Sequence, residues 1–589
     1  MAVAPPRQPQ YAAVASVAAD RTLVEPLGRT FLRPGAAYGT WQELEPCFNA
    51  LSEREIANAE DLHRWLQDLS ELEAMLSEVG AWRYIRMSTN TADKDAARAY
   101  EAFVTEVLPS VEEHTDRLHR KLMAVPFLGD LDQGDYAVYF RGIREQLRIF
   151  REANVPIQAE LRTMAQEYGA IIGAMSVEWR GETMTLPKAS SILESPDRSE
   201  REQVYRLIAE RRGRDSERLD TLFHDMVGKR HTIAVNAGFL NYRDYAYASL
   251  GRFDHDPKDA LEFHHSVETE VVPLLEALQL RRKKTLGLDR LRPWDLHADP
   301  TGKPPLRPFT DEEELITRTC DVFDRLDPYF GGCLRTMKAM GRLDLASRKG
   351  KAPGGYNYPL YETGAPFIFM NAVGTADDVV TMVHEGGHAV HSFLTHPLPL
   401  TGFKNFPSEV AELASMGMEL LSMDHWHLFH PDPEDLRRAK RDQLERVITI
   451  LPWVATIDAF QHANYTHPEW SIVQRSQAWA ETYHRFAGGA VDHEGLEAEC
   501  ARLWHKQLHV FELPFYYIEY AIAQLGAIGI WRNYRTDPKA AIADYSAALK
   551  LGYTRPLPDI YERAGVRLDL SRAYIAELVG FVRDEMERT

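Results

Sequence analysis

One stretch constrains this chain more than any other: residues 375–391, with the sequence TADDVVTMVHEGGHAVH. It contains an H-E-x-x-H pattern at His384–His388. A threonine followed three residues later by an aspartate is typical of a helix N-cap, and apolar residues flank the motif on both sides. On a helix, positions four apart differ by about 40° around the axis, so His384 and His388 face the same way and can share a metal ion. Glu385 lies beside them, where a carboxylate can act on water.

Two glycines, Gly386 and Gly387, lie inside this helical pattern. Each weakens a helix interior by about 1 kcal/mol relative to alanine. An ordinary helix with two ordinary histidines gives no reason for them, whereas the close approach of another backbone or of a substrate does. The sequence therefore favours a metal site on this helix.

Composition excludes several classes of protein. A formal charge of −19 over 589 residues argues against nucleic acid and anionic membranes as partners. No run of 18 apolar residues exists to span a membrane. The four cysteines are scattered, without a C-x-x-C pair, so we expect no disulfide framework and a reducing, cytoplasmic compartment. Residues 1–26 are expected to be a disordered tail rather than a cleaved signal. The sequence leaves the oligomeric state open.

The rest of the chain is mainly α-helical in pattern. We expect an N-terminal helical region at 27–199, ending in a β-hairpin around Gly181-Glu182, and a catalytic region at 200–589. Helical patterns before residue 200 cover Ser52–Val79, Asp93–Met123 and Tyr136–Ile172. Those after the motif cover Ser408–Leu428, Pro433–Phe460, Trp470–Ala487, Gly495–Gln524 and Leu568–Met586.

A short segment before the motif breaks the helical pattern. Gly354-Gly355-Tyr356-Asn357-Tyr358 is expected to be a loop, and Pro366–Asn371 a strand that includes Phe367, Ile368 and Phe369. A strand directly before a metal helix can align an extended peptide along an open edge. An ordinary buried strand explains the same residues equally well.

A catalytic zinc site needs a third protein ligand. Glu409, Glu412 and Glu419 lie on the next helical pattern, and Glu412 has the most apolar neighbours. A buried carboxylate is costly unless it is paired or binds a metal. His391 is a rival, but it lies about 10 Å along the axis from His384, so it is expected beside the ligands or on the surface. Asp424, His425, His427 and His430 form a second local cluster of histidines. Their spacing lacks an adjacent general base, so we do not expect a catalytic metal site there.

These motifs resemble the thimet oligopeptidase and oligoendopeptidase F family of zinc metallopeptidases. The resemblance rests on HEGGHAVH at 384–391, FPSEVAELAS at 406–415, and NAGFLNY at 236–242. PFYYIEYA at 514–521 is similar too. The resemblance covers residues 200–589 well, and the total length of the chain fits the oligoendopeptidase F branch of the family.

The resemblance implies Glu412 as the third zinc ligand. It also implies substrate-binding and transition-state-stabilising roles for His509, Tyr516, Tyr517 and Tyr520, of which Tyr520 is favoured. An aromatic stripe in the core is the alternative for these tyrosines. The implied fold is a mostly helical body with a deep channel that admits short unstructured peptides. Gly354, Gly355 and Tyr356 are expected to help align them.

The expected activity is endopeptidase hydrolysis of oligopeptides with one Zn²⁺ per chain, and Glu385 as general base. One alternative is a zinc exopeptidase of the carboxypeptidase or dipeptidyl carboxypeptidase type. The other is a non-catalytic helical binding protein, which the combination of His384, Glu385, His388 and Glu412 disfavours.

Overall fold

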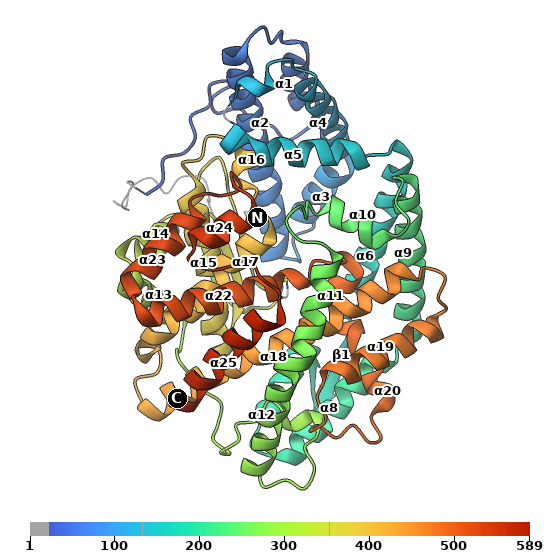
Figure 1. Cartoon of the computed structure of the whole chain (residues 1–589), viewed down its shortest axis with the longest axis vertical. Helices are drawn as coiled ribbons and strands as arrows, with labels where there is room; N and C mark the ends of the chain where they lie inside the picture. Colours follow the sequence, from blue (N-terminus) through green and yellow to red (C-terminus); the bar gives the residue numbers. More distant parts are fainter. Residues whose placement is uncertain (1–22, 132, 353) are drawn as a thin grey trace, which may run out of the picture. The chain divides into compact units, whose positions relative to one another are not determined.

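The computed structural model of the chain describes residues 23–131, 133–352 and 354–589. The expected tail lies mostly outside these residues. Helices dominate, as the sequence predicts, and the strands among these residues form two small sheets (Figure 1). Within the described residues, no helix has both the length and the apolar character needed to cross a membrane.

The chain forms two compact units, and each combines two separate stretches of sequence. Unit 1 comprises residues 1–118 and 309–404, and unit 2 comprises 119–308 and 405–589. The division expected near residue 200 separates two consecutive regions of sequence, whereas each compact unit joins two stretches. That division therefore stays a prediction.

Unit 1 contains the H-E-x-x-H helix and a three-stranded sheet. Its N-terminal helices are α1 (Trp41–Glu53), α2 (Ala59–Thr89), α3 (Lys94–Ala102), a π-helical turn (Phe103–Val107) and most of α4 (Leu108–Met123). Its second stretch contains α13 (Glu312–Leu326), α14 (Pro328–Ala339), β3 (Leu343–Ala346), β4 (Tyr356–Tyr358), β5 (Phe367–Ala372), α15 (Ala376–Thr395) and α16 (Thr401–Lys404).

The sheet of unit 1 has the order β3-β5-β4, with β5 parallel to β3 and antiparallel to β4. The expected strand at Pro366–Asn371 is therefore present, but the expected open edge is not. Phe367 pairs with Tyr358, and Ile368 pairs with both Asn357 and Leu343. Residues 356–358, expected to be loop, form the edge strand β4 instead. Alternating tyrosines stabilise it, since Tyr356 stacks on Phe369 at 4.8 Å between ring centroids.

Unit 2 is built mainly from helices around the long helix α18. Its first stretch contains α5 (Gln133–Ile149), α6 (Val155–Gly173), β1 (Ser176–Trp179), β2 (Glu182–Thr185), α7 (Leu186–Ser190), α8 (Arg198–Gly213), α9 (Ser216–Asn236), α10 (Tyr242–Ser249), α11 (Pro257–Ser266) and α12 (Val272–Thr285). Its second stretch contains α17 (Ser408–Ser422), α18 (Pro433–Thr466), α19 (Ile472–Phe486), α20 (Glu497–Cys500), η8 (Leu503–Lys506), α21 (Leu508–Glu512), α22 (Ile518–Thr536), α23 (Pro538–Leu549), α24 (Leu557–Arg563) and α25 (Arg572–Arg588).

The predicted hairpin is confirmed: β1 and β2 pair antiparallel around Arg180 and Gly181, both with positive φ. Two long helical predictions are wrong in detail. The pattern at Tyr136–Ile172 is divided into α5, which ends at Ile149, and α6, which begins at Val155 with Pro156 in its first turn, where a proline is tolerated because no backbone N–H is needed there. The pattern at Gly495–Gln524 is divided into short helices, and α22 begins only after Pro514.

Helices α17 and α22 approach each other closely inside unit 2. A Cβ built on Gly526 of α22 would lie 2.5 Å from the Leu413 side chain of α17. A Cβ on Gly417 would lie 3.1 Å from Tyr545, whose hydroxyl donates to the Ala414 carbonyl at 2.6 Å. Small residues thus let α17 pack tightly, and this packing positions its inward-facing glutamates.

Candidate metal centre

Helix α15 presents two histidines on one side, as predicted. Thr375 is its N-cap: the Thr375 hydroxyl accepts from the Asp378 N–H, and the Asp378 carboxylate accepts from the Thr375 N–H at 2.8 Å. The imidazole centroids of His384 and His388 lie 4.9 Å apart, and both rings are half-buried. Glu385, which follows His384 directly in the chain, is buried. The local sequence therefore fixes the helix and the spacing of its two potential ligands.

Gly386 is required by packing. A Cβ at this position would lie 2.6 Å from the Phe323 ring of α13, closer than real Cβ contacts. The neighbour of Gly386 is therefore an aromatic side chain, and not the backbone or substrate that the sequence predicted. The contact between Gly386 and the Phe323 ring packs α15 against α13 within unit 1.

Glu412 on α17 is buried and oriented by hydrogen bonds from unit 2. The Ser415 hydroxyl donates to its Oε2 at 3.0 Å. The Tyr516 hydroxyl donates to its Oε1 at 3.3 Å. These donors hold the carboxylate in one orientation, which is the usual role of groups around a metal ligand.

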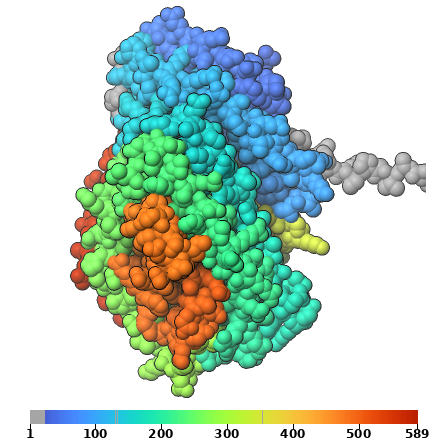
Figure 2. Space-filling model, turned by 90° about the vertical axis from the view of Figure 1, so that its right-hand side faces the viewer, coloured from blue at the N-terminus to red at the C-terminus, as the bar shows by residue number. Residues whose placement is uncertain are grey.

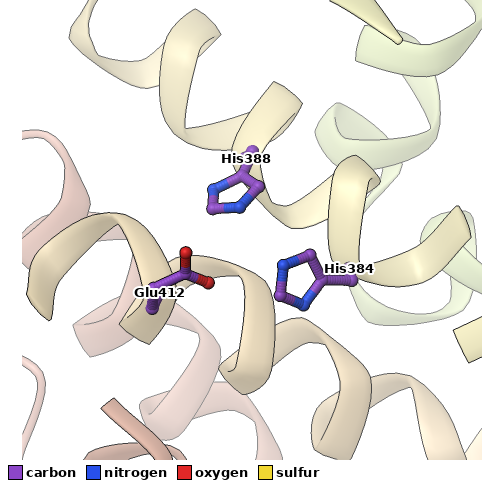
Figure 3. A group of neighbouring side chains, drawn as sticks. All are labelled: His384, His388 and Glu412. Carbon is purple, nitrogen blue, oxygen red and sulfur yellow. The ribbon is translucent and has the colours of Figure 1, made fainter. Parts of the chain in front are cut away.

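His384, His388 and Glu412 each have a ligand atom within 4.8 Å of the other two (Figure 3). Two imidazole nitrogens and one carboxylate form the donor set of catalytic zinc sites that leave a fourth position for water or substrate. The residues present thus fit the metal that the sequence predicts. This is the one group of three potential ligands found among the described residues.

The other residues that the sequence places near the metal ligands form contacts elsewhere or are buried in their own helix. Glu409 accepts from the His255 imidazole, with Nε2 and Oε1 2.9 Å apart, and Glu419 accepts from the Gln443 amide at 2.8 Å. His391 is fully buried on α15. Asp424 pairs with Arg535, and His425 lies 3.2 Å from the Tyr534 hydroxyl, so part of that cluster serves contacts within unit 2.

The aromatic residues expected to act on the substrate lie together in unit 2. His509 lies 4.9 Å from Tyr517, 5.5 Å from Tyr516 and 5.8 Å from Tyr520 between ring centroids. We call these four residues the tyrosine group. Tyr520 lies in the first turn of α22, whereas Tyr516 and Tyr517 precede the helix. Tyr516 connects the tyrosine group to Glu412, because its hydroxyl donates the hydrogen bond to the Glu412 carboxylate described above.

Burial sets the protonation of this group. It lowers the pKa of His509 to about 4, so the imidazole is neutral near pH 7, although the Glu412 carboxylate opposes the shift. It raises the pKa of Tyr517 to about 12, and raises those of Tyr516 and Tyr520 further. The tyrosines therefore keep their protons and remain hydrogen-bond donors.

The backbone before the tyrosine group is strained, a feature that the sequence analysis missed. Phe515 is fully buried and has φ of +68°, which is uncommon for a residue with a side chain. The Gln461 side-chain oxygen accepts from its N–H at 2.7 Å, and the Arg252 guanidinium donates to its carbonyl. These partners lie 54 and 263 residues away, so no local pattern could reveal them.

Two further residues adjoin His509. The Gln507 amide nitrogen donates to His509 Nδ1 at 2.8 Å, and the Trp453 Nε1–H donates to the Gln507 oxygen at 3.1 Å. Because Nδ1 accepts, the neutral imidazole carries its proton on Nε2. The chain Trp453–Gln507–His509 thus sets the tautomer.

The expected substrate-aligning residues lie in the sheet of unit 1. Gly354 has φ of +95°, and a Cβ on Gly355 would lie 3.3 Å from the Phe369 carbonyl. The Asn357 amide donates to the Glu385 carbonyl at 3.3 Å, which ties β4 to α15. Phe367, Ile368 and Phe369 are buried in the central strand. The edge available beside α15 therefore belongs to β4.

Comparisons with known proteins assign the family. The model of peptidase family M3 matches residues 191–580, and that of the peptidase M3 N-terminal domain matches residues 38–150. An oligoendopeptidase F homolog of Borreliella burgdorferi is 22% identical over 555 residues, covering 90% of each chain. The oligopeptidase PepF of Bacillus subtilis is 24% identical over 57% of this chain and 51% of its own length.

A solved structure of PZ peptidase A with an inhibitor has a TM-score of 0.87 and 26% identity, and covers 93% of this chain and 97% of that one. The mainly helical fold and the resemblance to oligoendopeptidase F expected from the sequence are therefore confirmed. The chain belongs to peptidase family M3 and is a metallopeptidase.

Proposed function

We propose that this peptidase is a zinc-dependent endopeptidase that hydrolyses short unstructured oligopeptides, with one zinc per chain. The observation that carries the proposal is the approach of ligand atoms from His384, His388 and Glu412 to within 4.8 Å of one another. Membership of a metallopeptidase family supports it. The four cysteines are free, which supports a reducing compartment such as the cytoplasm.

In this proposal His384, His388 and Glu412 hold the metal. Bound there, zinc would supply Lewis acidity toward water and toward the carbonyl oxygen of the scissile bond. Ser415 and Tyr516 keep the Glu412 carboxylate oriented through their hydrogen bonds. Glu409 and Glu419 neighbour Glu412 on α17 and engage His255 and Gln443 instead.

Glu385 serves as the general base. It adjoins His384 in the chain, and its helix is fixed by the Thr375 cap and by packing at Gly386. Its carboxylate accepts one proton from the attacking water as the oxygen bonds to the scissile carbonyl carbon. It then delivers that proton to the nitrogen of the leaving amine as the C–N bond breaks.

The tyrosine group stabilises the charge that develops on the carbonyl oxygen. Tyr520 donates from its hydroxyl and His509 donates from Nε2–H, since its Nδ1 accepts from Gln507. Tyr516 is engaged with Glu412, so its main role is to orient that carboxylate. Tyr517 packs against His509 and fixes its ring.

Strand β4 aligns the backbone of the substrate. As the edge strand, it has backbone groups for an added peptide strand, whereas β5 is paired on both sides. Gly354 and Gly355 leave room beside it, and Tyr356 is anchored by a 2.7 Å hydrogen bond to Ser88. This arrangement transfers the alignment role expected for Phe367–Phe369 to residues 354–358.

Product analysis tests the reaction. The purified protein, incubated with zinc and a peptide of ten to fifteen residues, should release internal fragments that mass spectrometry identifies. Release of only terminal residues or dipeptides would establish the exopeptidase alternative instead. Absence of any cleavage by zinc-loaded protein would contradict the proposed function.

Glu385→Gln tests the mechanism. It should bind zinc like the parent but lower kcat by at least about a hundredfold, because a general base contributes about 10²–10⁴ in rate. Metal analysis and kcat are measured on the same sample. Parental kcat in this variant would rule out Glu385 as the base.

A further inference from the structure

One strained residue separates the two parts of the tyrosine group. Phe515, with φ of +68°, lies between α21, which carries His509, and α22, which carries Tyr520. A left-handed backbone is costly for a residue with a side chain, and it persists only where surrounding groups hold it. The groups that hold Phe515 therefore also fix the course of the chain between His509 and Tyr520.

Two buried side chains hold the two polar groups of this backbone. Gln461 of α18 accepts from the Phe515 N–H at 2.7 Å, and Arg252, which follows α10, donates to the Phe515 carbonyl. Gln461 is fully buried, and the Arg252 side chain is 1% exposed. Both hydrogen bonds are therefore shielded from water, where a change of one partner is felt most strongly.

The Gln461 amide is used on one side only. Its oxygen holds Phe515, whereas its nitrogen has no hydrogen-bond partner among the residues that the structure describes. A buried donor without a partner is costly, and an apolar side chain of the same size would avoid that cost. An apolar side chain, however, could not accept from the Phe515 N–H. The contact with Phe515 therefore explains why a glutamine occupies this position.

Arg252 connects the strained residue to the helix that follows it. The guanidinium nitrogen that donates to the Phe515 carbonyl also donates to Glu519 at 2.9 Å. Glu519 precedes Tyr520 in the first turn of α22. The guanidinium carbon lies 4.6 Å from the centroid of the Tyr247 ring, which in turn lies 5.9 Å from the Phe515 ring. Arg252 thus holds both the residue before the tyrosines and the turn that contains Tyr520.

These contacts join the two stretches of sequence that make up unit 2. Arg252 belongs to the first stretch, and Gln461, Phe515 and Glu519 belong to the second. Figure 2 shows the two stretches meeting at the surface, where an orange segment around residue 500 is bordered by green segments of unit 2. At Arg252 the connection is polar and buried, and it ends at the tyrosine group.

We propose that Gln461 and Arg252 are positioning residues for peptide hydrolysis: they hold Phe515 in its left-handed conformation and so place the Tyr520 hydroxyl and the His509 imidazole for the substrate. The inference rests on the proposed function and adds two residues to it. Neither side chain contacts the substrate. Loss of either should lower kcat at saturating zinc, because the donors to the developing oxyanion are displaced.

The experiment uses the zinc-loaded full chain and one internally cleaved fluorogenic peptide. The variants are Gln461→Met, which removes the acceptor, Gln461→Glu, which retains an oxygen there, and Arg252→Met. Asn154→Leu is the matched control, because this buried amide donates to the Ile233 carbonyl at 3.1 Å elsewhere in unit 2. The readouts are kcat and KM for the zinc-loaded chain, and the melting temperature.

We expect Gln461→Met and Arg252→Met to lower kcat by about 10–100-fold and to change KM by less than about twofold, the effect of misplacing a catalytic donor by about 1 Å. Gln461→Glu should keep kcat within about threefold of the parent, since its oxygen can still accept. Asn154→Leu should lower the melting temperature and leave kcat unchanged.

A double-mutant cycle with Tyr520→Phe separates positioning from a general loss of structure. Once the Tyr520 hydroxyl is gone, Gln461→Met or Arg252→Met should lower kcat by less than about threefold further, because residues that act as a unit are not additive. The two cycles are independent, so either one tests the inference if the other variant does not fold.

Effects that multiply in a cycle would overturn the positioning role of the residue tested, and so would parental kcat in its single variant. Both results leave the proposed function intact. Failure of the zinc-loaded parent to cleave the peptide would instead overturn the proposed function.

Discussion

Tyr516 and Tyr520 are four residues apart, but they have different surroundings. The Tyr516 hydroxyl donates to Glu412, whereas Tyr520 lies in α22 with rings of His509, Tyr516 and Tyr517 around it. Removing a group that orients a metal ligand should weaken zinc binding, whereas removing a group that donates to the substrate should lower kcat. The two tyrosines can therefore be separated by removing one hydroxyl at a time.

We expect Tyr520→Phe to lower kcat by about 10²–10³ at saturating zinc, the usual effect of losing one donor to a developing oxyanion. Tyr516→Phe should instead weaken zinc binding by about 10–100-fold, the usual effect of losing a partner of a ligand. Kcat and competition with a chelator measure the two effects. Tyr534→Phe on the same helix, whose hydroxyl contacts His425, is the control. Parental kcat in Tyr520→Phe would contradict its assignment.

Glu519 links the strained backbone at Phe515 to the buried charges of unit 2. Arg252 donates to Glu519 at 2.9 Å and also to the Phe515 carbonyl. Burial and the nearby Glu409 carboxylate raise the pKa of Glu519 to about 8, despite this contact with Arg252. The folded state therefore holds a proton that the unfolded chain releases above its ordinary pKa of 4.5.

This raised pKa predicts a pH dependence of stability. The contribution of Glu519 is fully present below about pH 4.5 and is lost as the pH rises through about 8. The melting temperature of the parent should thus fall more between pH 5 and pH 8.5 than that of Glu519→Gln, which cannot ionise. Parallel melting curves against pH for the two proteins would contradict it.

The residues that sequence could predict are those fixed by local spacing. His384, Glu385 and His388 follow from the period of one helix, and Glu412 from the resemblance of its segment and its apolar neighbours. Gln461, Arg252 and Trp453 could not be predicted, because their importance comes from partners 54 to 263 residues distant. No sequence pattern encodes such contacts.

At the scale of elements, close packing at α15 depends on Gly386. We expect Gly386→Ala to lower the free energy of unfolding by about 1–3 kcal/mol, because the added methyl overlaps the Phe323 ring. Gly580→Ala is the control, since a Cβ there meets nothing within 4 Å, and it should raise stability by up to about 1 kcal/mol. Chemical denaturation measures both. Equal stabilisation by the two substitutions would show that α15 does not need this glycine.

Element boundaries were harder to predict than element types. The motif helix and the β1–β2 hairpin were predictable because a cap or a turn marks their ends. The order of strands around β5 was not, since periodicity does not reveal which strand lies at an edge. The helix predicted across Pro514 was wrong because apolar spacing continued through a residue that cannot extend a helix.

For the whole molecule, membership of peptidase family M3 gives peptides as the class of substrate. The formal charge of −19 predicts that nucleic acid is not a partner, and this stays a prediction. The mainly helical class was predictable from pattern alone. The two compact units were not, because each joins segments that are far apart in sequence.

The proposed function requires that His384, His388 and Glu412 together hold one zinc. The most direct test is zinc content after dialysis against a weak chelator, measured by mass spectrometry on the parent and on Glu412→Ala, with Glu409→Ala as the neighbouring control. We predict one zinc per chain in the parent and in Glu409→Ala, and at least about tenfold less in Glu412→Ala. One zinc per chain retained in Glu412→Ala would rule out Glu412 as a zinc ligand.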